Sequence, residues 1–103
     1  EDPALIININ KRYKRFMTLQ ELYDVTRSSW IVGKRRDKVK YAFAAYRGLV
    51  REVFRIDKWN KVGNRWEFIG EVAEPSVRDK YLNQSLENYI KKGSRNPIRY
   101  ASC

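Results

Sequence analysis

The sequence has 103 residues, which is enough for one domain (residues 1–103) and too few for two. Hydrophobic residues make up 43% of the chain, and 22 Lys and Arg against 12 Asp and Glu give a net charge of +10, so we expect a basic globular domain rather than a disordered tail. One cysteine and no histidine exclude an internal disulfide, cysteine or histidine zinc sites and the usual catalytic triads.

The first elements follow from local patterns. Residues 4–10 are rich in β-branched side chains and predict a buried strand. Thr18 and Glu21 have the spacing of a capping box, which predicts a helix that starts there and ends near Arg27. We expect Leu19 to lie on the buried side of this helix.

The middle of the chain predicts strands and one basic loop. Residues 30–32 read as a short strand, and residues 34–40 as a loop with five cations. Residues 39–47 and 49–57 predict two antiparallel strands around a tight turn at Gly48. A helix is the competing interpretation of this region, because its apolar residues also fit helical spacing. The alternation of apolar and charged residues in the second strand favours strands.

The last third begins with the clearest strand, residues 65–72, where apolar and charged residues alternate. A capping pattern at Ser76 predicts a second helix through Asn83, and residues 85–90 predict a further short helix. A last edge strand is expected near residues 98–100. The order of elements predicts an α+β fold, with a curved, mostly antiparallel sheet or partial barrel and two or three short flanking helices.

The sequence offers little for catalysis. The carboxylates are scattered, and Glu52 and Glu67 lie on predicted strands beside Arg or Lys, where solvated cross-strand pairs explain them. No dinucleotide fingerprint, P-loop or nucleophile elbow is present. We therefore expect no catalytic residue, no cofactor and no metal ligand. The alternative left open is a metal-dependent nuclease that holds a divalent ion on Glu52 or Glu67.

The positive charge is concentrated in three clusters, each with an aromatic residue nearby. Self-repulsion at a net charge of +10 costs stability, which indicates a partner of opposite sign. Long basic side chains in loops reach phosphates, and aromatic rings stack on bases. We therefore predict binding of nucleic acid, DNA or RNA, through its phosphate backbone. The predicted contacts are Lys11, Arg12, Lys14, Arg15, Lys34, Arg35, Arg36, Lys38, Lys40, Lys91, Lys92, Arg95 and Arg99.

The positive charge has two other interpretations. A basic surface that serves only solubility is one, and an acidic protein partner is another. The chain begins at Glu1 without Met, so a piece of a larger parent protein is also an expectation. No apolar run approaches membrane-spanning length and no signal peptide is visible, which predicts a cytoplasmic protein with no membrane partner.

The tryptophans are candidates for a base-stacking pocket. Trp30 follows Ser28 and Ser29 at the predicted junction between helix and strand, where it could line a pocket for a planar ligand. Trp59 ends a predicted strand and is either a rim residue or a lid on the core. Trp66 alternates with apolar neighbours and is predicted to be a core residue. A core position is the alternative for each candidate.

Five runs of residues carry a resemblance. They are similar to a group of small bacterial domains that has no assigned function, and they comprise residues 22–30 (LYDVTRSSW), 41–48 (YAFAAYRG), 50–53 (VREV), 65–68 (RWEF) and 96–100 (NPIRY). More broadly, the layout resembles the PUA-like superfamily, which includes the EVE, YTH and ASCH domains. That resemblance implies a small curved barrel with flanking helices.

The PUA-like resemblance also implies a site. Several members of that superfamily read RNA or modified bases in an aromatic pocket, which would place Trp30, Trp59 and either Ser28 or Ser29 at such a pocket. A weaker resemblance to GIY-YIG nucleases implies a metal-dependent nuclease. The chain lacks a clear GIY…YIG pair of motifs.

Overall fold

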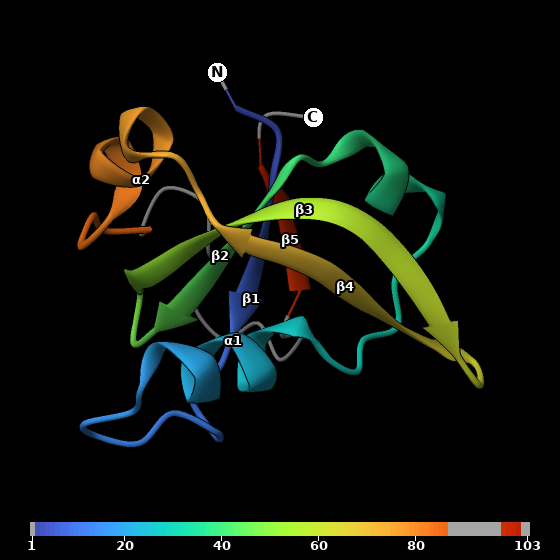
Figure 1. Cartoon of the computed structure of the whole chain (residues 1–103), viewed down its shortest axis with the longest axis horizontal. Helices are drawn as coiled ribbons and strands as arrows, with labels where there is room; N and C mark the ends of the chain where they lie inside the picture. The colour runs from blue at the N-terminus through green and yellow to red at the C-terminus, as the bar shows by residue number, and fades with distance from the viewer. Residues whose placement is uncertain (1, 87–97, 102–103) are drawn as a thin grey trace.

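The computed structural model describes residues 2–86 and 98–101, which form one mixed sheet with helices on both faces (Figure 1). In chain order the elements are β1 (Ala4–Asn8), α1 (Leu19–Arg27), the 3₁₀ helix η1 (Lys34–Lys38), β2 (Tyr41–Tyr46), β3 (Leu49–Val62), β4 (Arg65–Val72), α2 (Pro75–Tyr81) and β5 (Ile98–Ala101).

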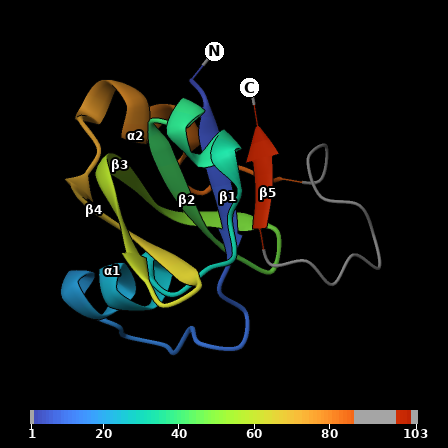
Figure 2. The same ribbon diagram turned by 90° about the vertical axis from the view of Figure 1, so that its right-hand side faces the viewer.

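The sheet is open and has the strand order β4-β3-β2-β1-β5. β1 runs parallel to β2, and the pairs β1–β5, β2–β3 and β3–β4 are antiparallel. The predicted α+β architecture is confirmed, and three of the four strand pairs are antiparallel, in line with the expected mostly antiparallel sheet. Closure into a barrel is not observed in the described part of the chain, because β4 and β5 lie at opposite edges of the sheet (Figure 2).

The central strands are buried on both faces of the sheet. Leu5 and Ile7 of β1 pack in one core cluster with Leu22 of α1. Ile6 points to the other face and packs in a second cluster with Val77 of α2. Burial on both sides explains why β1 reads as a continuous apolar run and not as an alternating one.

The helix α1 starts as the sequence predicts. The Thr18 hydroxyl oxygen accepts a hydrogen bond from the Glu21 N–H at 3.1 Å, and the Glu21 carboxylate accepts one from the Thr18 N–H at 3.0 Å. The predicted burial of Leu19 is wrong, since 52% of this residue is exposed. The buried stripe of the helix begins one turn later, at Leu22 and Thr26.

β3 is much longer than predicted and continues past Asp57 to Val62. The pairing with β4 shifts register between Ile56 and Lys58, which marks a β-bulge. A bulge bends a strand and increases its twist. The bulged β3–β4 hairpin therefore curls over one face of the sheet (Figure 1).

The segment after α1 also differs from its prediction. The expected strand over residues 30–32 is reduced to a single bridge, in which Trp30 pairs with Trp66 of β4. Residues 34–38 form the 3₁₀ helix η1 and not an open loop. The Arg36 side chain contributes to this local structure, because its guanidinium donates to the Gly33 carbonyl at 2.9 Å.

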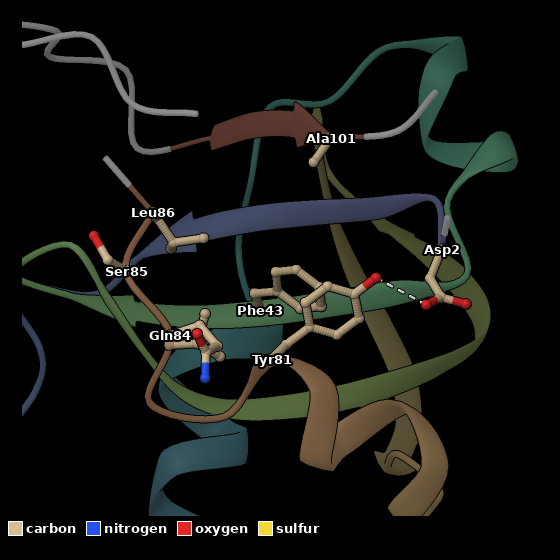
Figure 3. Close-up of a pocket in the computed structure, with 8 residues that line it drawn as sticks. Asp2, Phe43, Tyr81, Gln84, Ser85, Leu86 and Ala101 are labelled. Atoms are coloured by element: carbon tan, nitrogen blue, oxygen red, sulfur yellow. Dashed lines mark hydrogen bonds between the residues drawn. The ribbon is translucent and has the colours of Figure 1, made fainter. Parts of the chain in front are cut away.

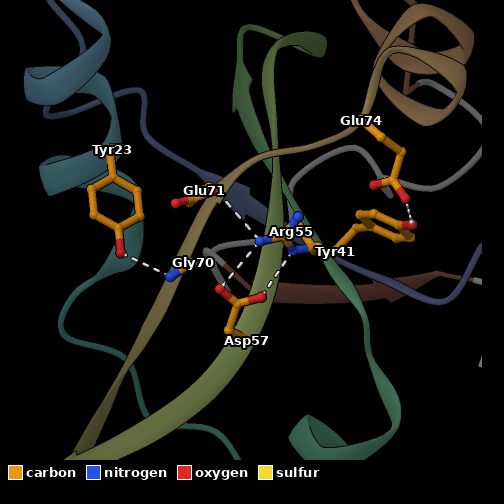
Figure 4. A network of polar contacts seen from close by, with 7 residues as sticks. All are labelled: Tyr23, Tyr41, Arg55, Asp57, Gly70, Glu71 and Glu74. Atoms are coloured by element: carbon orange, nitrogen blue, oxygen red, sulfur yellow. Dashed lines mark hydrogen bonds and ion pairs between the residues drawn. The ribbon is translucent and has the colours of Figure 1, made fainter.

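Contacts from α1 and from Trp30 occupy the outer edge of β4. The Tyr23 hydroxyl accepts a hydrogen bond from the Gly70 N–H at 3.0 Å, shown in Figure 4, and Arg27 Nε donates to the Phe68 carbonyl at 3.0 Å. With the Trp30 bridge, these contacts satisfy backbone groups that an edge strand would otherwise expose. They also fix the chain after α1 against the hairpin.

The helix α2 differs from its prediction at both ends. Ser76 does not cap it, because the helix begins at Pro75, whose fixed φ and missing N–H suit the first helical position. It ends at Tyr81 and not at Asn83. Asn83 has a φ of 65°, a left-handed conformation that cannot continue an α-helix.

The predicted helix over residues 85–90 is not formed where the structure describes it. Ser85 makes an isolated bridge with Leu49, so the segment starts in an extended conformation. The rest of this prediction lies in residues 87–97, outside the described part of the chain. The same segment holds three of the predicted phosphate contacts, namely Lys91, Lys92 and Arg95.

A buried ion pair joins α2 to the sheet. Glu52 is 6% exposed, and its carboxylate accepts hydrogen bonds from Arg78 Nε at 2.7 Å and Arg78 Nη2 at 3.2 Å. The hydrogen bond to Glu52 raises the pKa of Arg78. The pair therefore holds the one α-helix that covers this face in the described residues.

Removal of this carboxylate should destabilise the fold. We expect Glu52→Ala to lower the free energy of unfolding by roughly 2 kcal/mol, because it leaves a partly buried guanidinium without its partner. Urea unfolding followed by tryptophan fluorescence measures this. Lys80→Ala, which breaks the exposed pair with Asp2, is the control and should change stability by less than about 1 kcal/mol. Equal stability of the two variants would contradict the expectation.

Candidate nucleic-acid interface

A cavity of about 520 Å³ lies between η1 and the β3–β4 hairpin. Its apolar lining comes from side chains of both hairpin strands and of the segment that follows η1. Its polar lining is dominated by cations, which project from η1, from its C-terminal side and from β3. The lining residues are Arg36, Asp37, Val39, Lys40, Ile56, Asp57, Lys58, Trp59 and Trp66.

Trp59 is a fixed, half-buried wall of this cavity. Its indole Nε1 donates a hydrogen bond to the Arg36 carbonyl at 3.1 Å. Its ring meets the buried Phe68 ring edge to face, with centroids 5.7 Å apart and an interplanar angle of 77°. These contacts anchor the indole from two sides while part of the residue stays accessible.

The guanidinium of Arg36 lies over the second indole, that of Trp66. The Arg36 guanidinium carbon lies 3.6 Å from the Trp66 ring centroid, a cation–π contact. The Arg36 side chain is only 17% exposed, and its buried Nε has no hydrogen-bond partner among the residues that the structure describes. Arg36 therefore brings a positive charge to the cavity that is held in place against Trp66.

The acidic groups of the cavity leave its charge positive. Asp57 is bound by Arg55, with the Arg55 Nε 2.8 Å from a carboxylate oxygen, and this hydrogen bond holds the pKa of Asp57 below its usual value (Figure 4). A carboxylate oxygen of Asp37 lies 4.0 Å from the Nε of Arg36. Because Asp57 is neutralised by an arginine outside the lining, the cations of the lining outweigh its acids.

The lysines around η1 are available to a ligand. Lys34, Lys38 and Lys40 are exposed. None of them forms an ion pair with a residue in the ranges 2–86 and 98–101, where the acidic partners of ion pairs are held by other cations. Their charges are not used to hold the fold and can neutralise an external anion.

Trp30 lies in the core and not at this cavity. It is 7% exposed, and its Nε1 donates to the Thr26 carbonyl at 2.7 Å. The Arg12 guanidinium lies over its ring, 4.6 Å from the centroid. The structure therefore does not bring the predicted pair Trp30 and Trp59 to one cavity. Trp66, predicted to be a core residue, packs partly buried against the core and also lines the cavity.

Ser28 and Ser29 also lie outside the lining of this cavity. The Ser28 carbonyl accepts a hydrogen bond from Arg12, and the Ser29 carbonyl accepts one from Arg65 at 3.3 Å. Arg12 additionally donates to the Val25 carbonyl at 3.2 Å, so it caps the end of α1. This cation, predicted to contact phosphate, has a structural role.

Two further predicted contacts, Arg35 and Arg99, border a second cavity of about 410 Å³ on the other side of η1. The Arg35 guanidinium lies over the Tyr100 ring, 4.2 Å from its centroid. η1 thus directs two consecutive arginines to opposite sides, each against an aromatic ring. The predicted basic cluster over residues 34–40 thus contributes side chains to two cavities that contain aromatic residues.

A smaller cavity, about 170 Å³, lies on the α2 side of the sheet (Figure 3). Its polar edge is Asp2, whose carboxylate accepts hydrogen bonds from Lys80 Nζ at 2.6 Å and from the Tyr81 hydroxyl at 2.8 Å. These two hydrogen bonds lower the pKa of Asp2. Among the described residues the lining includes no cation, and Phe43 and Val50 make part of it apolar, which does not suit a phosphate group.

Glu52 and Glu67, the carboxylates of the nuclease alternative, are both held in ion pairs, the latter with Arg27 at 3.0 Å. Among the described residues, no three His, Cys, Asp or Glu side chains converge in a way that could hold a metal ion. In the same part of the chain, no helix has the length and apolar character needed to cross a membrane.

No protein-family model matches this chain, and no curated protein or solved structure matches it significantly. The residues of the cavity and their geometry are therefore the features that indicate a function for this chain.

Proposed function

We propose that this protein binds single-stranded nucleic acid, DNA or RNA, with an unpaired base in the cavity between η1 and the β3–β4 hairpin. The observation that carries the proposal is the meeting of two half-buried indoles, Trp59 and Trp66, with Arg36, Lys40 and Lys58 in one cavity. Aromatic faces stack on bases of any sequence, and cations beside them neutralise the adjacent phosphates.

The recessed position of the indoles supports an unpaired base over a duplex. In a duplex both faces of each base are covered by its stacked neighbours, so a base must leave the stack to meet an indole inside a cavity. A base that is already unpaired avoids most of this cost. A base reader of the PUA-like kind, for a normal or a modified base, is the specific form of this proposal.

The lysines of η1 and its C-terminal side support the phosphate contacts. Lys34, Lys38 and Lys40 are exposed and are not engaged in ion pairs with described residues, and Lys40 lines the cavity that would hold the base. Phosphate contacts of this kind release condensed counterions, so the affinity must fall as salt rises. A titration of a labelled single-stranded oligonucleotide by fluorescence anisotropy, at low and moderate salt, tests this. No binding, or binding that salt does not weaken, would overturn the proposal.

Loss of the Trp59 indole should weaken binding of the base specifically. We expect Trp59→Leu to lower the affinity for a single-stranded oligonucleotide about tenfold, since one base–aromatic stack contributes about 1–3 kcal/mol. Trp59→Phe keeps a ring and should lose less. Affinity for inorganic polyphosphate, which has no bases, should stay unchanged in both variants. An equal loss for polyphosphate would mean that Trp59 acts only through the fold.

A further inference from the structure

A second group of cations gathers away from the cavity. Lys11, Lys14 and Arg15 are exposed in the loop before α1. Arg47, in the turn between β2 and β3, and Arg51, near the start of β3, are exposed as well. None of the five forms an ion pair with a residue in the described ranges. In both overall views this loop and η1 lie on opposite sides of the molecule (Figures 1 and 2).

The loop and the turn are joined by specific contacts. The Arg47 N–H donates to the Asn10 side-chain oxygen at 2.8 Å. The Tyr13 ring packs on the Tyr46 ring with centroids 4.3 Å apart, and Arg51 Nη2 donates to the Tyr13 hydroxyl at 3.1 Å. The cations of the two segments are therefore held on one surface and do not belong to independent loops.

Phe16 lies at the rim of this surface, and its contacts with described residues do not explain a role in folding. It is 92% exposed, and the Arg15 guanidinium lies 5.5 Å from its ring centroid. Its φ is 63°, in the left-handed region that costs a non-glycine residue about 1 kcal/mol or more. A large apolar ring held in a strained and exposed position beside cations points to an external ligand.

We infer that this surface is a second contact for the same nucleic-acid strand, with phosphates on the cations and an unpaired base on Phe16. We call it the loop–turn patch, formed by Lys11, Lys14, Arg15, Phe16, Arg47 and Arg51. The inference rests on the proposed function of the cavity. The protein has extents of 31 × 29 × 28 Å, and a nucleic-acid strand must pass around it to occupy both sites. Only a long oligonucleotide can therefore engage both sites together.

The two sites predict a dependence on strand length. Once the cavity is occupied, the patch binds a tethered segment at high effective concentration, which adds affinity without any new contact at the cavity. The test compares oligothymidylates of about 6 and about 24 nucleotides, lengths that bracket common site sizes. The variant combines Lys14→Gln, Phe16→Ala and Arg47→Gln. The matched control combines Lys34→Gln and Lys38→Gln at η1.

We expect the patch variant to bind the long strand about tenfold or more weaker than the unmodified protein, and the short strand within about twofold. The control should weaken both strands by a similar factor. Long homopolymers also gain affinity because they can bind in several registers. The informative quantity is therefore the affinity of the variant divided by that of the unmodified protein, at each oligonucleotide length. The three replaced side chains are exposed, and thermal unfolding checks that the variant keeps its fold.

The outcomes separate the two proposals. If the unmodified protein binds neither strand, the function proposed for the cavity fails. If it binds both and the patch variant behaves like it at each length, the second site is overturned and the first stands. A last measurement is the binding of the protein to vesicles rich in phosphatidylserine. Binding of these vesicles that requires Phe16, with nucleic-acid affinity unchanged in the variant, would assign the patch to a lipid surface and overturn the inference.

Discussion

Gly70→Ala should lower the free energy of unfolding by about 3 kcal/mol, a large fraction of the stability of a small domain. A Cβ at this position would lie 1.7 Å from the Arg55 carbonyl oxygen and 2.9 Å from its carbon. Both atoms belong to the backbone of β3, so neither can move without breaking the pairing of the two strands. The clash therefore has to be relieved by separating β4 from β3.

The same substitution should disturb the contact between α1 and β4. The Gly70 N–H donates to the Tyr23 hydroxyl at 3.0 Å, and the β3 bulge between Ile56 and Lys58 lies opposite this residue. Separation of the strands would weaken both features. Urea unfolding of the purified variant, followed by tryptophan fluorescence, measures the loss.

Gly33→Ala is the matched control for this prediction. No atom lies within 4 Å of a Cβ built at Gly33, and its φ of −90° is open to any residue. Its stability should stay within about 0.5 kcal/mol of the unmodified protein. If Gly70→Ala is as stable as Gly33→Ala, the close approach of β3 and β4 at this point is not a feature of the folded protein.

Features decided by neighbours in sequence were predictable. The capping box of Thr18 and Glu21 satisfies backbone groups within four residues, so its outcome depends on no distant part of the chain. The strand over residues 65–72 is likewise marked by alternation alone. Their positions agree with the structure because the physical cause of each is local.

Features decided by distant contacts were not predictable. β3 continues to Val62 because β4 pairs with it along that length and a bulge accommodates the mismatch. Residues 30–32 fail to form a strand because Trp30 alone meets Trp66, while Arg27 and Tyr23 occupy the next positions along the β4 edge. No local pattern shows which partner reaches that edge.

The candidate site shows the same division. The sequence identifies the cations of residues 34–40 and the aromatic character of Trp59, because charge and residue type are read directly. It does not decide between a pocket and a core position for Trp30, which is buried, and it does not show that Trp66 lines the cavity as well as packing against the core. Alternation indicates which face of a strand points inward, but not how far along the strand other segments cover that face. Here the covering segment ends at η1, and this decides which indole stays accessible.

Replacement of the three lysines around η1 should have the largest effect on binding. We expect the combined variant Lys34→Gln, Lys38→Gln and Lys40→Gln to bind a single-stranded oligonucleotide about 100-fold more weakly at low salt. Each phosphate contact contributes about one unit to the slope of log affinity against log salt, so the slope should fall by about 2 to 3. Anisotropy titrations at several salt concentrations measure both quantities.

Two controls make this result specific to the site. Arginine at the same three positions keeps the charge and should retain most of the affinity and the slope. Lys80→Gln removes a lysine that pairs with Asp2 on the α2 side of the molecule, and it should change the slope by much less than one unit. A triple variant with an unchanged slope would show that the strand avoids η1. The cations of the loop–turn patch would then have to account for the salt dependence alone.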